Sequence, residues 1–258
     1  MSRTSKPVIH FLIPAYNEED NLPFLFSNLR RIASFLEHEY HVTLVNDCST
    51  DGTSSLAHQA SQSQPITVID FSENRGPGAA FDAAFSSALA NSSPHDIFVT
   101  IEADNTSDLC ILSKMLVRIE RGADVVLASV YGSGKVVGAP FSRIVLSFFA
   151  NLLMKVTLGM PHINTFSSFF RMYRREGIEK TYQMYGNQTI TEPGFVCMVE
   201  LLIKFKRAGL KMVETPMLLD SNIRVGDSKM KIARTTLSYF HVLGKHLFTS
   251  AYHPNSDS

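Results

Sequence analysis

The stretch VIHFLIPAYNEE, residues 8–19, is a short apolar run that ends abruptly in a polar loop. The same change occurs twice more: Val42–Val45 runs into NDCSTDGT, residues 46–53, and Ile97–Ile101 runs into EAD, residues 102–104. In an open parallel α/β sheet, ligands bind in the crevice beyond the carboxyl ends of the strands. The three acid-rich loops therefore predict one shared site. Its carboxylates and glycine-bearing turn suit a nucleotide diphosphate carried with a divalent metal.

Short β-rich runs alternate with helical patterns through the first half of the chain, which favours βαβ units and a largely parallel, doubly wound α/β sheet. Strands are expected at Val8–Ile13, His41–Val45, Ile66–Phe71, Ile97–Ile101 and Asp124–Ala128. Helices are expected at about Glu19–Glu37, Asp51–Ser63, Pro77–Ala90 and Asp108–Arg121. Asp51 or Ser49 is expected to cap the second of these helices, and Ser107–Asp108 the fourth.

The regular alternation of strand and helix patterns ends after Tyr131. Glycines at 132–134 and the Gly138–Pro140 run predict a mobile loop. The remaining expected elements are helices at about Arg143–Leu158 and Glu192–Ala208, a strand at Lys211–Leu218, and a last amphipathic helix at about Lys231–Leu247. Since no linker or repeat is visible, one domain is expected. Its catalytic part spans residues 1–230, followed by the helix and polar tail of 231–258.

Composition limits the class of protein. A length of 258 residues with 45% hydrophobic content suits one large folded domain. The formal net charge of zero implies no general attraction to nucleic acid. Three widely spaced cysteines suit a reducing compartment. Neither a signal peptide nor a membrane-spanning run is visible, because Asn151 and Lys155 interrupt the apolar segment 144–160. We expect a cytoplasmic protein, in peripheral contact with a membrane if helix 144–158 lies in the interface.

Six motifs, in order along residues 8 to about 230, resemble the family-2 glycosyltransferases of the GT-A fold. Within that family they are most similar to the dolichol- and polyprenol-phosphate sugar synthases. The motifs are PAYNEE (14–19), VNDCSTDGT (45–53), NRGPGAA (74–80), EAD (102–104), FRMYRRE (170–176) and RVGDSK (224–229). Taken one at a time, each is equally compatible with an ordinary turn or helix cap. The resemblance rests on the whole series.

For the sugar-nucleotide donor, the resemblance implies a pocket lined by Pro14, Tyr16, Asn17 and Glu18, with Asp47 at the edge of the base. Asn74, Gly76 and Gly78 lie in a turn that enters a helix. Small residues there allow close backbone approach, and helix N-terminal amides favour an anion. Helix–sheet packing is the alternative explanation for these glycines. Arg171 is also assigned to the donor pocket, whereas Arg174 and Arg175 are interpreted as a solvated helix start.

For the diphosphate, Glu102-Ala103-Asp104 stands where the family has an Asp-x-Asp metal motif. Asp104 is the preferred ligand for Mg²⁺ or Mn²⁺, and the role of Glu102, which replaces the usual Asp, stays open. Arg224 and Lys229, on either side of a glycine, are expected to contact the diphosphate. Asp104, Arg224 and Lys229 are therefore the expected catalytic residues.

The chain also departs from the lipid-phosphate synthases. Ser129-Val130-Tyr131 replaces the usual Ser-Arg-Tyr, and Lys135 or Arg143 is a candidate substitute for the lost arginine. Phe169 stands at a usual glycine, and the family's Asp before that segment is missing. These differences affect the expected sugar and acceptor more than the fold.

The acceptor is expected to be a polyprenyl phosphate. The chain has no tryptophan and no Glu-Asp pair other than Glu19-Asp20, so the general-base motif of polysaccharide synthases is absent. A phosphate acceptor is already ionised and needs no base. The expected reaction is inverting, metal-dependent transfer of mannose or glucose from GDP or UDP to polyprenyl phosphate. Transfer to a soluble acceptor and a non-catalytic nucleotide-sugar-binding subunit are the alternatives.

Overall fold

A computed structural model of the chain describes residues 6–138, 141–220 and 244, and gives only the backbone for 141–146 and for 149 and 150. Arg224 and Lys229 lie outside the described residues, as do the division expected at residue 230 and, apart from residue 244, the helix expected at Lys231–Leu247. Among the helices that the structure describes, none is both long and apolar enough to cross a bilayer.

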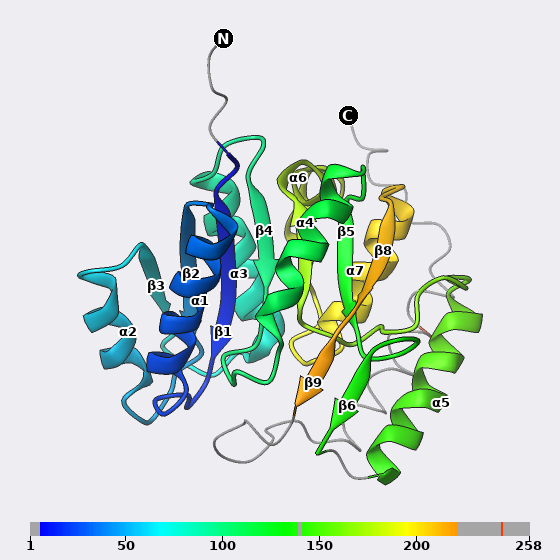
Figure 1. The fold of residues 1–258 in the computed structure, drawn as a ribbon, viewed down its shortest axis with the longest axis horizontal. Helices are drawn as coiled ribbons and strands as arrows, with labels where there is room; N and C mark the ends of the chain where they lie inside the picture. Colours follow the sequence, from blue (N-terminus) through cyan, green and yellow to red (C-terminus); the bar gives the residue numbers. More distant parts are fainter. Residues whose placement is uncertain (1–5, 139–140, 221–243, 245–258) are drawn as a thin grey trace.

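A seven-stranded sheet forms the centre of the molecule (Figure 1). Its strands, in spatial order, are β3 (Ile66–Asp70), β2 (Tyr40–Asn46), β1 (Ile9–Ala15), β4 (Ile97–Thr100), β7 (Arg171–Arg174), β5 (Val125–Ser129) and β8 (Met212–Pro216). Every pairing is parallel except those of β7, which is antiparallel to both β4 and β5. The other six strands therefore end at one common edge.

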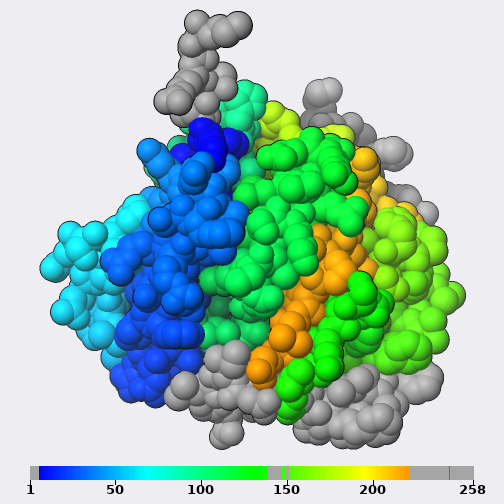
Figure 2. Space-filling view, viewed as in Figure 1, coloured from blue at the N-terminus to red at the C-terminus, as the bar shows by residue number. Residues whose placement is uncertain are grey.

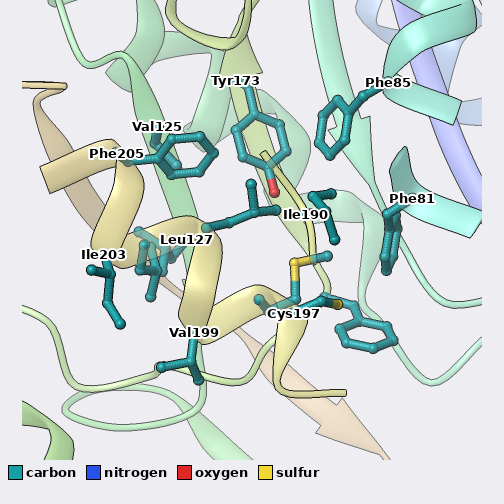
Figure 3. Close-up of a cluster of buried hydrophobic side chains, with 14 of the residues drawn as sticks. Phe81, Phe85, Val125, Leu127, Tyr173, Ile190, Cys197, Val199, Ile203 and Phe205 are labelled. Atoms are coloured by element: carbon teal, nitrogen blue, oxygen red, sulfur yellow. The ribbon is translucent and has the colours of Figure 1, made fainter. Parts of the chain in front are cut away.

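Helices cover both faces of this sheet, because its strands are apolar on both sides. One face packs against α3 (Gly76–Ala90) and α7 (Cys197–Arg207), through a core that includes Phe85, Phe205 and Leu12 of β1 (Figure 3). The other packs against α1 (Leu22–Leu36) and α4 (Leu112–Glu120), blue and green in Figure 2, through a core that includes Phe11 and Ile13 of β1. The alternation along β1 is that of a strand buried on both sides.

The remaining elements complete the edge and the periphery. They are α2 (Thr53–Ser61), the 3₁₀ turn η1 (Leu109–Ile111), α5 (Phe141–Thr157), α6 (Arg175–Tyr185) and the 3₁₀ turn η2 (Gly186–Gln188). A second, two-stranded sheet is formed by β6 (Lys135–Val137) and β9 (Leu218–Asp220). In Figure 1, β6, β9 and α5 lie toward the edge at which β1 ends.

The α/β class, the parallel order and the five strands expected in the first half are confirmed, each strand within two residues. Within the loop expected after Tyr131, Lys135–Val137 forms a strand that pairs in parallel with β9, while residues 139 and 140 lie outside the described part. The strand expected at Lys211–Leu218 is divided into β8 and the start of β9. The helix expected from Glu192 begins only at Cys197, because Pro193 and Gly194 interrupt it.

Candidate functional site

The loops that follow β1 and β2 are joined by hydrogen bonds at the common edge of the sheet. The Asn17 N–H donates to Ser49 Oγ (2.9 Å), and Asn17 Oδ1 accepts from the Thr50 N–H (2.8 Å). The Glu18 N–H donates to Thr53 Oγ1 (2.7 Å). Asn17 has a positive φ of 54°, a conformation that asparagine tolerates better than most residues. The two loops therefore form one unit that carries Asn17 and Glu18, with Tyr16 exposed beside them.

Asp47 ties this unit to the turn at the start of α3. Its carboxylate is buried and accepts from two backbone amides, the Arg75 N–H at Oδ1 (2.7 Å) and the Gly76 N–H at Oδ2 (2.8 Å). Asn74 Nδ2 donates in addition to the Asp47 carbonyl oxygen (3.1 Å). Asp47, Asn74 and Gly76 are thus brought together as the sequence predicts. The partners of the Asp47 carboxylate here are amides of the protein.

The glycines of this turn are required by another backbone segment. The Gly78 N–H donates to the Pro193 carbonyl oxygen (2.9 Å). A Cβ on Gly78 would lie 1.9 Å from the Glu192 carbonyl oxygen, and a Cβ on Gly76 would lie 2.4 Å from that of Pro193. Close approach is therefore the reason for these glycines, and the approaching group is the chain itself. The amides of Gly76 and Gly78, expected to face an anion, are engaged by Asp47 and Pro193.

The third loop, after β4, contains the acids of the expected metal motif. Asp104 is 7% exposed, and its Oδ1 accepts from the N–H (3.1 Å) and Oγ1 (2.7 Å) of Thr106. Asn105 Nδ2 donates to the Asn21 carbonyl oxygen (3.0 Å), which ties this loop to the start of α1. Glu102 is half-buried. All three acid-rich loops therefore meet at one edge.

These acids fit a hard divalent cation. Mg²⁺ and Mn²⁺ in nucleotide enzymes are held by one or two carboxylates together with diphosphate oxygens, and Asp104 and Glu102 supply carboxylates of that kind. Within the described part of the chain, no three His, Cys, Asp or Glu side chains gather into a cage that would hold a metal alone.

The strand β9, which precedes the basic motif in the sequence, contacts this loop. The Asp220 N–H, at the end of β9, donates to the Thr106 carbonyl oxygen (3.4 Å), two residues beyond Asp104. Arg224 is four residues after Asp220, a chain length that reaches about 14 Å at most. Arg224 and Lys229 themselves lie outside the described residues, so their contact with the diphosphate stays a prediction.

Arg171 does not lie at a surface to which a sugar-nucleotide donor could bind. Its side chain is fully buried and donates to the carbonyl oxygens of Met198 (2.9 Å) and Phe166 (2.7 Å). The assignment of Arg171 to the donor pocket does not fit this position. Its guanidinium group is bonded to buried carbonyl oxygens and therefore stabilises the fold.

The interpretation of the next two arginines is half right. α6 begins at Arg175, as expected, but both side chains are partly buried and bonded to the protein. Arg174 Nε donates to the Ala123 carbonyl oxygen (2.9 Å). The Arg175 side chain, 11% exposed, forms an ion pair with Glu179 (2.8 Å).

The second half of the edge holds residues that sequence reasoning did not single out. Glu214 on β8 accepts from the N–H (2.7 Å) and Nδ2 (2.7 Å) of Asn164 and from the Thr165 N–H (2.8 Å). Lys155 Nζ donates to Asn164 Oδ1 (2.9 Å). Asn164 is therefore held by an acid on β8 and a lysine on α5. An acidic residue inside an otherwise apolar strand was the available signal.

Two other departures from the family have structural explanations. Phe169, at the usual glycine, is buried between Phe81 (ring centroids 5.0 Å apart) and Phe195 (5.2 Å), so its ring fills the core beneath α3. Tyr131 donates its hydroxyl to Ser147 Oγ on α5 (2.7 Å). The Ser-Val-Tyr segment therefore connects β5 to α5.

One face of α5 is apolar and exposed. Phe148, Leu152 and Val156 follow at four-residue spacing and are 51%, 45% and 72% exposed, with Leu153 (39%) beside them. Residues at this spacing lie on one stripe of a helix.

Two cavities among the described residues, of about 310 and 200 Å³, lie elsewhere, and neither is lined by the three acid-rich loops.

Residues 11–182 match the family model described as glycosyl transferase family 2. The chain is 29% identical over 234 residues to the polyprenol monophosphomannose synthase of Mycolicibacterium smegmatis, covering 90% of this chain and 84% of that protein. It is 30% identical over 238 residues to the dolichol-phosphate mannosyltransferase of Pyrococcus furiosus, again over 90% of this chain but only 61% of that protein.

Solved structures share the fold at lower identity. Glucosyl-3-phosphoglycerate synthase of Mycobacterium tuberculosis, in complex with Mn²⁺, UDP and phosphoglyceric acid, superposes with a TM-score of 0.62 at 18% identity, covering 97% of this chain and 80% of that one. A mannosyltransferase of Pyrobaculum calidifontis, in complex with GDP-mannose and Mn²⁺, gives 0.62 at 16% identity, covering 97% and 67%. The fold is that of the GT-A glycosyltransferases. From its sequence motifs, its sheet and these similarities, the chain belongs to glycosyl transferase family 2 and is a glycosyltransferase.

Proposed function

We propose that this enzyme transfers a hexose, mannose or glucose, from a GDP- or UDP-sugar to a polyprenyl phosphate. The observation that carries the proposal is the similarity to polyprenol monophosphomannose synthase along 90% of the chain. The buried Asp104 at the end of β4 supports it, because a carboxylate at that position is what a metal-bound diphosphate requires.

The residues have distinct roles in this proposal. Asp104, assisted by Glu102, would hold Mg²⁺ or Mn²⁺, which neutralises charge on the departing nucleoside diphosphate. Asp47 would accept an N–H of the base, since each carboxylate oxygen has a lone-pair site beyond the one used by Arg75 or Gly76. Arg224 and Lys229 would bind the diphosphate. Pro14, Tyr16 and the joined loops carrying Asn17 and Glu18 would form the wall of the pocket.

The proposed chemistry is a direct displacement with inversion. A phosphate oxygen of the acceptor attacks the anomeric carbon, the bond from that carbon to the diphosphate oxygen breaks, and the electron pair leaves with the nucleoside diphosphate. No proton has to be removed from an ionised phosphate. The only Glu-Asp pair in the sequence is Glu19-Asp20, and Glu19 Oε2 accepts from the Gly52 N–H (2.5 Å). This structural role of Glu19 supports a mechanism that does not use the pair as a general base.

The acceptor explains the exposed face of α5. Phe148, Leu152 and Val156, with Lys155 nearby, form the kind of stripe that lies in a membrane interface. In this proposal α5 contacts the membrane that contains the polyprenyl chain, which gives the enzyme a peripheral location at its cytoplasmic face.

A direct test incubates the purified enzyme with radiolabelled GDP-mannose or UDP-glucose, Mn²⁺ and polyprenyl phosphate. Label that moves into the lipid phase and is released by mild acid is the expected result. Turnover with a water-soluble phosphate or saccharide, and none with polyprenyl phosphate, would instead establish the second candidate, a soluble acceptor. The altered Ser129–Tyr131 segment and Phe169 motivate that candidate. A donor that neither lipid nor soluble acceptors can use contradicts both.

A further inference from the structure

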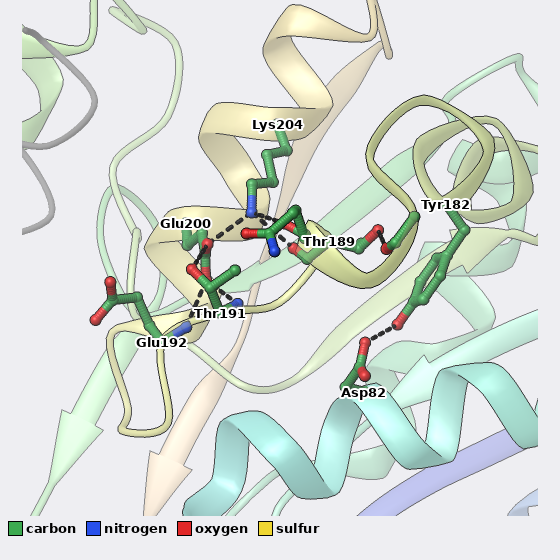
Figure 4. Close-up of polar contacts among 9 residues, drawn as sticks. Asp82, Tyr182, Thr189, Thr191, Glu192, Glu200 and Lys204 are labelled. Atoms are coloured by element: carbon green, nitrogen blue, oxygen red, sulfur yellow. Dashed lines mark hydrogen bonds and ion pairs between the residues drawn. The ribbon is translucent and has the colours of Figure 1, made fainter. Parts of the chain in front are cut away.

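A buried ion pair lies on α7, in the second half of the chain, outside the three acid-rich loops. Lys204 Nζ and Glu200 Oε1 are 2.6 Å apart, and their side chains are 5% and 0% exposed (Figure 4). Removing two charges from water is expensive, and well-packed apolar residues often replace such a pair without loss of stability. A buried pair of this kind therefore calls for an explanation other than stability.

Each member of the pair holds the backbone of one short segment, Gln188–Pro193. Glu200 accepts from the Thr191 N–H (2.9 Å), from Thr191 Oγ1 (2.6 Å) and from the Glu192 N–H (2.9 Å). Lys204 Nζ donates to the carbonyl oxygens of Gln188 and Thr189, the latter at 3.1 Å. Figure 4 shows Lys204, Glu200 and the segment in contact, while the carboxylate of Glu192 points away from the pair.

The charge of Glu200 is maintained at this site. Burial by itself raises the pKa of the Glu200 carboxyl, but the Lys204 ammonium and the donors of Thr191 and Glu192 outweigh burial and hold the pKa below its ordinary value. The ionised carboxylate can therefore accept all three hydrogen bonds at neutral pH.

The held segment in turn holds the donor side of the proposed active site. The Pro193 carbonyl oxygen accepts from the Gly78 N–H (2.9 Å), and the Glu192 and Pro193 backbone passes so close to Gly76 and Gly78 that a Cβ fits at neither. Those glycines belong to the turn whose amides bind the Asp47 carboxylate. A continuous series of contacts thus leads from Lys204 and Glu200 to Asp47.

We propose that Glu200 and Lys204 are positioning residues for the sugar-nucleotide donor. Through the Gln188–Pro193 segment they hold the Arg75–Gly78 turn and Asp47 in the conformation that binds the nucleotide. The inference rests on the proposed function, since it requires that the Asp47 side of the edge binds the donor.

The test measures donor affinity in a variant that removes the charges but keeps the volume. In the Glu200→Leu/Lys204→Met double variant, apolar packing replaces the pair while the segment loses its hydrogen bonds. We expect the dissociation constant for GDP or UDP with Mn²⁺, by calorimetry, to rise about tenfold. Transfer should show a higher KM for the donor, with a smaller change in kcat at saturating donor.

A matched control separates positioning from mere stability. The Tyr182 hydroxyl on α6 donates to Asp82 Oδ1 on α3 (2.8 Å), so Tyr182→Phe removes a part-buried hydrogen bond to α3 outside the Arg75–Gly78 turn. We expect that variant to melt at a lower temperature and to keep wild-type donor affinity. A double variant with unchanged donor affinity overturns the proposal.

Gly78→Ala provides a second route if the double variant does not fold. Its Cβ displaces the Glu192 backbone from the turn, whereas Gly194→Ala, two residues from Glu192, meets no atom within 4 Å. Weakened donor binding in Gly78→Ala, restricted to that variant, supports the proposal, and equal affinity in both overturns it. If the wild-type chain binds neither GDP nor UDP, the proposed function itself fails, an outcome distinct from equal binding by wild type and variants.

Discussion

The two halves of the sheet edge are built in different ways. The loops after β1, β2, β3 and β4 direct their polar groups at one another: Asn17 binds Thr50, Asp47 binds the Arg75–Gly76 amides, and Asn105 binds Asn21. Beyond β5, the helix α5 exposes Phe148, Leu152 and Val156. A preorganised polar site suits a nucleotide with fixed hydrogen-bonding groups, and an exposed apolar stripe suits a lipid surface. The comparison teaches that, under the proposed function, donor and acceptor would be recognised at separate places along one edge.

The largest effect is expected at the metal loop. Asp104→Asn keeps an oxygen for Thr106 but loses the charge, so we expect sugar transfer to fall by about 10²-fold or more. The measurement is steady-state transfer, with calorimetric donor binding as a function of Mn²⁺. Asp108→Asn is the matched control, because Asp108 accepts a helix-capping bond from the Cys110 N–H (2.9 Å), a role that asparagine performs. Equal activity in the two variants would remove Asp104 from the site.

A smaller effect is expected at the turn that Asp47 holds. Asp47→Ala leaves the Arg75 and Gly76 amides without their acceptor, so we expect the donor dissociation constant to rise about tenfold or more. Calorimetry with GDP and UDP measures it. The control is Asp124→Ala, which also removes a carboxylate from a backbone amide, that of Lys211 (2.7 Å), but at the opposite end of the sheet. Donor binding that survives in Asp47→Ala would contradict the role of Asp47.

The proposed membrane contact of α5 is tested by vesicle binding. Replacing Phe148, Leu152 and Val156 together by serine should reduce partitioning onto vesicles at least about tenfold, since it removes the apolar area available for burial. Cosedimentation with vesicles that contain polyprenyl phosphate measures the effect, and nucleotide binding should be unchanged. Phe35→Ser is the control, because Phe35 is 76% exposed on α1, on the donor half. A triple variant that still binds vesicles like wild type would place the membrane contact elsewhere.

The smallest expected effect is on the stability of the protein at acidic pH. Because the folded-state pKa of Glu200 lies below its ordinary value of 4.5, its contribution to stability is present above that value and is lost as pH falls through the folded-state pKa. Between about pH 5 and about pH 3, the wild-type melting temperature should therefore fall about 2–4 °C more than that of Glu200→Gln. Circular dichroism melts measure the difference. If the melting temperatures of the two proteins changed with pH in parallel, Glu200 would have the same pKa in the folded and unfolded states, which would contradict the prediction.

Local sequence signals predicted local features well. Asp108 accepts from the Cys110 N–H and caps the 3₁₀ turn η1 that leads into α4, close to the expected cap. Asp51 Oδ1 accepts from the Thr53 N–H (3.0 Å), but the N-cap residue of α2 is Gly52. The strands of the first half were predicted because period and length are local properties. The antiparallel insertion of β7 between β4 and β5 was not predicted, because strand order depends on pairings between residues far apart in the chain.

The sequence by itself determined the α/β class, the family and the placement of the acid-rich loops at strand ends, because each of these follows from short-range patterns and from motifs in a fixed order. Only the tertiary structure decided what those side chains contact. It buried Arg171 in the core, directed the Asp47 carboxylate to the Arg75 and Gly76 amides, and placed Pro193 against Gly78. The reason is physical: buried polar groups must find partners, and chain folding determines which partners are within reach.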